Sequence, residues 1–121
     1  MPSKTPVPWD FPSKLTATVT LPTPPNATPS STPTPNILLL LYGIGDTAAG
    51  FSAFGRAINL SETTVVTVQA PAPLPFDLGG FHWGDDVAFD STTGALDMDA
   101  GLTRSTALAD LVRGTLIRKC G

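Results

Sequence analysis

The sequence predicts an α/β protein with a mixed or parallel sheet, preceded by a proline-rich arm. Three patterns favour this class: an apolar run at Ile37–Tyr42, apolar residues at helical spacing over 48–58, and a β-branched run at Thr64–Ala70. A strand, a helix and a further strand in this order are typical of right-handed crossovers in an α/β sheet. The chain has 121 residues, which suits one domain.

The first 36 residues differ in composition from the rest. Ten of the thirteen prolines lie there, and Pro22–Pro35 is too rich in proline for a helix or a central strand. Leu15–Leu21 alternates apolar residues with threonine, the pattern of a half-buried edge strand. We therefore predict an arm over residues 1–36 that carries one edge strand at about 15–21.

The second region opens with the apolar strand and a helix. Because every position of Ile37–Tyr42 is apolar, we expect this strand to be covered on both faces. The helix over 48–58 should bury one apolar stripe. The members of that stripe are Phe51, Phe54 and Ile58. Asp46 or Thr47 is suited to be the N-cap of this helix.

The rest of the chain predicts a strand at Thr64–Ala70, an irregular loop over about 71–94, and a last helix that ends near Gly121. The apolar positions of that helix are Leu102, Leu108, Leu111, Val112 and Leu116. Asp97 or Asp99 is expected to open it. A further strand should follow in such an alternating pattern, so we expect a domain that is truncated.

Composition excludes several partners and cofactors. The net charge is −3 and the basic residues are scattered, so we expect neither nucleic acid nor an anionic membrane as partner. Cys120 is the single cysteine, which excludes an internal disulfide and a multi-cysteine zinc site. No apolar run approaches the ~20 residues of a membrane span, and the acidic residues fit no EF-hand spacing. We expect a cytoplasmic protein without metal or cofactor; its oligomeric state is open.

The turn after the apolar strand can present backbone N–H groups to a ligand at the carboxyl edge of the sheet. Gly43 and Gly45 allow close approach, and the N–H groups around Ile44 would face the crevice. Such groups stabilise either an oxyanion or a phosphate. Gly43–Ala48 fits the dinucleotide pattern G-x-G-x-x-A, but the next strand ends in Gln69-Ala70 where a ribose-binding acid is expected. A dinucleotide-binding domain is therefore an alternative that the sequence disfavours.

The segment Leu40-Leu-Tyr-Gly-Ile-Gly-Asp-Thr47, with Gly50-Phe51 after it, resembles the L-H-G-x-G-D-T…G-[WF] box of the phospholipase/carboxylesterase family. This family of α/β-hydrolases includes the acyl-protein thioesterases. The resemblance continues in Val68–Pro71 and Phe81–Asp85, covers roughly residues 37–120, and is to fungal-type members. One departure is Tyr42, which stands where the family has a histidine that is not the triad base.

The resemblance implies that residues 37–121 are the N-terminal half of an α/β-hydrolase domain, a three-layer αβα sheet truncated before the nucleophile strand. It implies that the Ile44 N–H contributes to an oxyanion hole and that Gly43 and Gly45 let substrate approach. Phe81 and Trp83 would shape the acyl site. The substrate would be an acyl ester or thioester, hydrolysed through an acyl-serine.

The chain itself lacks the catalytic serine, acid and base of that family. The closest match to G-x-S-x-G is G-x-S-x-x-G around Ser52, inside the first helix, and Ser105 lies in the last helix. His82 is the single histidine and precedes every candidate for the nucleophile. We therefore expect the chain alone to be inactive. The alternative from another class is a non-catalytic α/β binding module.

Overall fold

A computed structural model describes residues 2–29, 32–41, 48–76, 78–97 and 100–121 of the chain. The elements in chain order are a short 3-10 helix η1 (Pro8–Asp10), β1 (Thr16–Thr20), β2 (Asn36–Leu41), α1 (Ala48–Ile58), β3 (Thr63–Gln69), β4 (Ala72–Pro73), β5 (Phe81–His82), β6 (Ala88–Phe89), β7 (Leu96–Asp97) and α2 (Thr103–Cys120). The three long predicted strands are thus confirmed to within one residue at each end. The two predicted helices are also present, in the predicted order.

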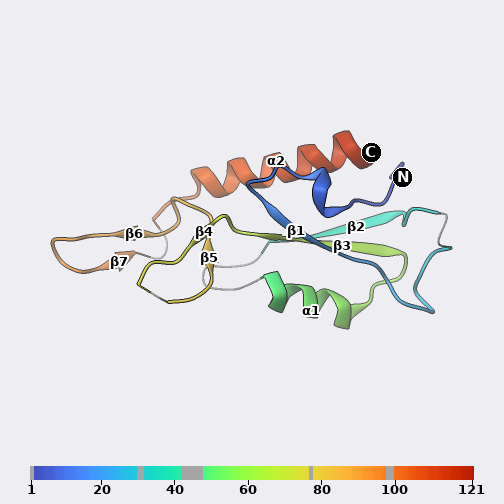
Figure 1. The fold of residues 1–121 in the computed structure, drawn as a ribbon, viewed down its shortest axis with the longest axis horizontal. Coiled ribbons are helices and arrows are strands. Elements are labelled where there is room, and N and C mark those ends of the chain that lie inside the picture. Colours follow the sequence, from blue (N-terminus) through green and yellow to red (C-terminus); the bar gives the residue numbers. More distant parts are fainter. Residues whose placement is uncertain (1, 30–31, 42–47, 77, 98–99) are drawn as a thin grey trace.

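The main sheet has three strands in the order β1-β3-β2. β1 runs antiparallel to β3, with Ala17 opposite Val68, and β2 runs parallel to β3, with Leu39 opposite Val66. Helices α1 and α2 lie on opposite sides of this sheet, and the short hairpins β4-β5 and β6-β7 extend from one end (Figure 1). This is a small mixed α/β arrangement; the larger three-layer sheet of an α/β-hydrolase stays a prediction.

The hydrophobic core lies between the sheet and α2. Val66 and Val68 of β3 are fully buried there, together with Val112 of α2. The other buried members of this cluster are Phe11, Leu15, Ala17, Ala70 and Trp83. Three of them, Phe11, Leu15 and Ala17, come from the first 36 residues, so the arm supplies part of the core as well as an edge strand.

Helix α1 does not bury the stripe that its sequence predicts. Its buried side chains include Ser52, and at Gly55 a Cβ would lie only 2.9 Å from Cγ1 of Val65. Phe54 is 55% exposed and Ile58 is 39% exposed. The prediction for these two residues was wrong because the close contact with β3 requires small residues on the helix. The periodicity of apolar residues marks the large side chains and does not show which helix face can approach a neighbouring strand closely.

The position of the apolar strand in the sheet, and therefore its burial, also differ from the prediction. We predicted that Ile37–Tyr42 is covered on both faces, but β2 is an edge strand of the described sheet and its leucines are only half-buried. The strand covered on both faces is β3, which is buried from Thr63 to Val68. Threonine in a central strand is accepted because its branched side chain packs well on a pleated surface.

Candidate functional site

A cavity of about 340 Å³ lies at the carboxyl end of β2. Its described lining residues are Leu41, Trp83, Ser105, Thr106 and Ala109. Leu41 is the last residue of β2, and the three small residues belong to the first turns of α2. The carboxyl edge of a parallel strand pair is the usual place for a ligand in α/β proteins, and the volume lies within the range of small-molecule sites.

The predicted oxyanion loop lies outside the described residues. Gly43, Ile44 and Gly45 belong to the undescribed segment 42–47, as do the departure at Tyr42 and the two proposed caps of α1. Since β2 ends at Leu41 and α1 begins at Ala48, this segment joins the carboxyl end of β2 to the start of α1. The predicted roles of the three loop residues therefore stay predictions.

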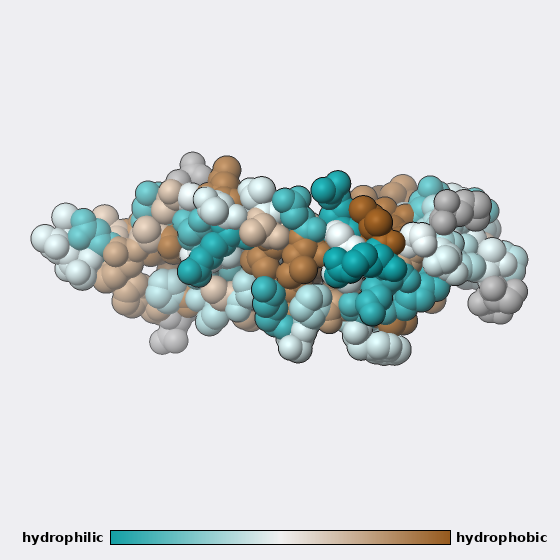
Figure 2. Space-filling view, turned by 90° about the horizontal axis from the view of Figure 1, so that it is seen from above, coloured by the Kyte–Doolittle hydropathy of each residue, from teal (hydrophilic) through white to brown (hydrophobic). Residues whose placement is uncertain are grey.

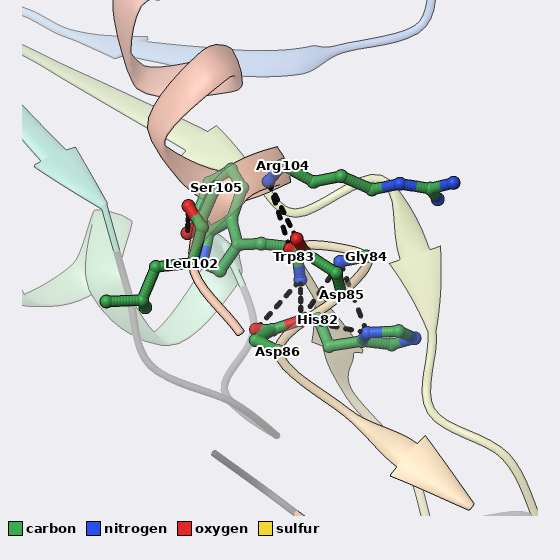
Figure 3. A network of polar contacts seen from close by, with 8 residues as sticks. All are labelled: His82, Trp83, Gly84, Asp85, Asp86, Leu102, Arg104 and Ser105. Atoms are coloured by element: carbon green, nitrogen blue, oxygen red, sulfur yellow. Dashed lines mark hydrogen bonds and ion pairs between the residues drawn. The ribbon is translucent and has the colours of Figure 1, made fainter. Parts of the chain in front are cut away.

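The lining residue Trp83 belongs to a tight turn organised by the Asp86 carboxylate. Asp86 is 5% exposed, and its Oδ1 accepts hydrogen bonds from the Trp83 N–H at 3.0 Å and the Gly84 N–H at 2.9 Å. The His82 Nδ1 lies 3.1 Å from the same oxygen, and Figure 3 shows all three donors converging on it. Because an ionised carboxylate can only accept, Nδ1 of His82 carries the proton of that hydrogen bond.

The charge of Asp86 follows from this set of donors. Burial alone would raise the pKa of the carboxyl, but the hydrogen bonds from Trp83, His82 and Gly84 outweigh burial and hold the pKa below its usual value. Asp86 is therefore an anion at neutral pH whose acceptor capacity is used by its own turn. Its arrangement fixes the backbone of Trp83 against the cavity.

The neighbouring carboxylate of Asp85 opens α2. Its two oxygens accept the backbone N–H of Arg104 at 3.0 and 3.1 Å (Figure 3). The expected opening by Asp97 or Asp99 was wrong for Asp97, which lies in β7; Asp99 is outside the described residues. An acceptor from a distant loop replaces a local N-cap, since Leu102 at the N-cap position has no side-chain oxygen.

The two aromatic residues predicted for the acyl site lie in different places. Trp83 is 8% exposed and lines the cavity, while Phe81 of β5 is half-buried and packs against the hydrophobic core cluster. The sequence did not point to Leu41, Thr106 or Ala109 as lining residues. Nothing in a local pattern marks them, because the cavity is formed where α2 passes β2.

The remaining candidates carry out structural roles. Ser52 is buried in α1, and the Ser105 Oγ donates to the Leu102 carbonyl at 3.0 Å. Within the described residues, the His82 Nδ1 hydrogen-bonds to Asp86 in its own turn, and His82 bonds to no serine. The same part of the chain contains no group of three or more His, Cys, Asp or Glu side chains that could hold a metal ion. It also contains no helix with the length and apolarity to cross a membrane.

Comparison with known proteins adds a family context. The chain is similar to an uncharacterized hydrolase of Schizosaccharomyces pombe, with 29% identity over 86 residues, which are 68% of this chain and 35% of that protein. It is similar to an uncharacterized hydrolase of Mycosarcoma maydis, with 35% identity over 88 residues, which are 71% of this chain and 33% of that protein. No family model and no solved structure matches it. The chain spans about a third of the length of these curated relatives, and the matches support a hydrolase family.

Proposed function

We propose that this chain provides the oxyanion side of a serine hydrolase that cleaves carboxylic esters or thioesters. The observation that carries the proposal is the similarity to two fungal hydrolases, together with the G-x-G-D-T box that directly follows β2 in the chain. The cavity beside Trp83 and Leu41 supports it, because an apolar site at this edge suits an acyl group.

The reaction assigns a limited role to these residues. A serine from the remaining part of a complete enzyme attacks the acyl carbon, and negative charge develops on the carbonyl oxygen. The Ile44 N–H donates a hydrogen bond to that oxygen, with Gly43 and Gly45 giving the substrate room. Trp83 provides an apolar surface for the acyl chain. The chain alone has no nucleophile for this reaction, so it binds without turnover.

A chimera tests the proposal. Residues of this chain replace the matched third of the M. maydis hydrolase, and hydrolysis of p-nitrophenyl esters of different acyl length is measured. Ile44→Pro removes the N–H, and we expect kcat to fall about 10²- to 10³-fold. Ile44→Ala keeps the N–H and is the matched control. Equal activity of the proline and alanine variants would contradict the role of Ile44, and turnover by the 121-residue chain alone would contradict the assignment of the nucleophile.

A further inference from the structure

The dipeptide Thr-Pro occurs five times in the chain, outside the proposed hydrolase site. One copy lies in the N-terminal segment and four lie in the loop between β1 and β2; the threonines are Thr5, Thr23, Thr28, Thr32 and Thr34. A residue before proline is confined to extended conformations. A hydroxyl on an extended backbone with proline directly after it is what proline-directed protein kinases recognise. The fold decides which of the five threonines such a kinase can reach.

Four of the five threonines gather around one small cavity, of about 90 Å³, between the N-terminal segment and the loop. They are Thr5, Thr28, Thr32 and Thr34. Thr34 is 4% exposed, and its hydroxyl lies 2.6 Å from the Thr64 Oγ1. Pro6, the proline after Thr5, is fully buried. A kinase that needs both the hydroxyl and the proline cannot reach these two copies without opening the core.

The two copies at Thr28 and Thr32 are restricted in a milder way. The Thr28 Oγ1 donates to the Thr32 carbonyl at 3.1 Å, so this hydroxyl is used within the loop. Thr32 is exposed, but Pro33 after it is half-buried. Each copy at the cavity therefore has either its hydroxyl or its proline partly withheld.

The copy at Thr23 is presented outward. Thr23 and Pro24 are both exposed, and Thr23 is not among the residues that line the cavity. Its bonds to Asn59 use the backbone, and its hydroxyl has no hydrogen-bond partner among the described residues. The loop lies at the end of the sheet away from the two hairpins (Figure 1). Figure 2 shows pale surface there, neither strongly hydrophobic nor strongly hydrophilic, as threonine and proline produce.

We propose that Thr23 is a phosphorylation site for a proline-directed protein kinase. In the transfer, the Thr23 Oγ1 attacks the γ-phosphorus of ATP and a new O–P bond forms. The bond from that phosphorus to the β,γ-bridging oxygen breaks, ADP leaves, and the hydroxyl proton passes to a base of the kinase. The proposal goes beyond the hydrolase function and does not require it.

The phosphate would act on the end of α1. Asn59 directly follows this helix, and its N–H donates to the Gly55 carbonyl. Its side chain accepts the Thr23 N–H at 2.9 Å and donates to the Thr23 carbonyl at 3.2 Å. A phosphothreonine carries about −1.5 to −2 charges at neutral pH, and the carbonyl end of a helix is negative. The two like charges repel each other, so phosphorylation should weaken the bonds between Thr23 and Asn59.

The charged side chains near this end differ in sign. Glu62 belongs to the same turn region, since its N–H donates to the Asn26 carbonyl at 2.8 Å, and its carboxylate adds to the repulsion. Arg56 in the last turn of α1 opposes it, but this side chain is exposed, so water weakens its attraction for a phosphate. We therefore expect repulsion to dominate.

Phosphate incorporation into the folded chain tests the site. The 121-residue chain is incubated with ATP and a mitogen-activated protein kinase, a proline-directed enzyme, and the initial rate at each threonine is measured by mass spectrometry. A peptide of residues 19–38 is the comparator, because no fold limits access to its four threonine sites. Pro24→Ala removes the proline of the site, and Pro25→Ala, one exposed residue further, is the matched control.

We expect Thr23 to react at least about tenfold faster than the other four threonines in the folded chain, because those require local opening first. In the peptide the four rates should be similar. Pro24→Ala should lower the rate at Thr23 by a similar factor, and Pro25→Ala should leave it unchanged. Equal rates at Thr23 and Thr34 in the folded chain, or no incorporation at Thr23, would overturn the assignment.

Hydrogen exchange measures the effect on α1 separately. The Asn59 amide should exchange faster in the phosphorylated chain than in the unmodified chain, because its contact with the loop is weakened. Thr23→Val treated with the same kinase is the control and should show no change. Unaltered exchange at Asn59 after phosphorylation of Thr23 would contradict the proposed effect on the helix end.

Discussion

Replacing Asp86 by alanine should destabilise the chain and loosen the wall of the cavity. The carboxylate accepts the backbone N–H groups of Trp83 and Gly84 and the Nδ1–H of His82. Alanine removes the acceptor from the buried Trp83 N–H, which costs about 1–3 kcal/mol. The Gly84 N–H is half-buried and can turn to water, so it adds about 1 kcal/mol.

The expected loss is therefore about 2–4 kcal/mol, which at about 4 °C per kcal/mol lowers the melting temperature by about 8–16 °C. Asp86→Asn keeps one oxygen that can accept both N–H groups and should lose about half as much. Asp110→Ala is the control, since its exposed ion pair contributes about 0–0.5 kcal/mol.

The pH dependence has a definite sign. The pKa of folded Asp86 lies below its ordinary value, so the stabilisation by its carboxylate is complete above about pH 4 and is lost as the pH falls through the lower folded pKa. The difference in stability between the unmodified chain and Asp86→Asn should therefore narrow below about pH 4. Circular dichroism during thermal unfolding measures both effects. A melting temperature of Asp86→Ala within 2 °C of the unmodified chain would refute the reasoning.

Two further predictions concern single side chains. The Thr67 Oγ1 is buried and has no hydrogen-bond partner among the described residues, whereas the equally buried Thr64 Oγ1 lies 2.6 Å from the Thr34 hydroxyl. In urea unfolding, Thr67→Val should raise the free energy of unfolding by about 1 kcal/mol, and Thr64→Val should lower it by about as much. Equal effects of the two substitutions would contradict this difference. Gly84 has a φ of +127°, and a Cβ there would lie 2.6 Å from Cδ of Arg104. Gly84→Ala should therefore lower the free energy of unfolding, measured by thermal unfolding, by about 1–3 kcal/mol. If adding Arg104→Ala restored full stability, the backbone conformation at residue 84 would not be the cause of the loss.

Local patterns in the sequence were sufficient to predict the elements. Alternation of apolar residues with threonine predicted β1, and the β-branched run predicted β3, because strand formation depends on the side chains of neighbouring positions. Helix α1 was predicted from Ala48 to Ile58, with the bounds that the structure has. The same periodicity failed for its orientation, since the choice of Ser52 and Gly55 over Phe54 depends on the shape of β3 beneath it.

The candidate site depends on contacts that no local pattern contains. Asp85 caps a helix that starts 18 residues later in the chain, and Leu41 and Ala109 line the same cavity only because α2 passes over β2. One signal was present in the sequence: two consecutive aspartates after an aromatic-rich segment, where a tight turn needs acceptors for its own N–H groups. Their roles became definite only when the fold brought the turn and the helix start together.

The two aspartates connect the site to the rest of the fold in different directions. The Asp86 carboxylate accepts hydrogen bonds within its own turn, from the Trp83 N–H, whereas the Asp85 carboxylate accepts the Arg104 N–H in the first turn of α2. Because Ser105, Thr106 and Ala109 follow directly on that helix, one short loop segment sets both Trp83 and the α2 wall of the cavity. A change in this loop should therefore move two walls at once, while the third wall at Leu41 stays with β2.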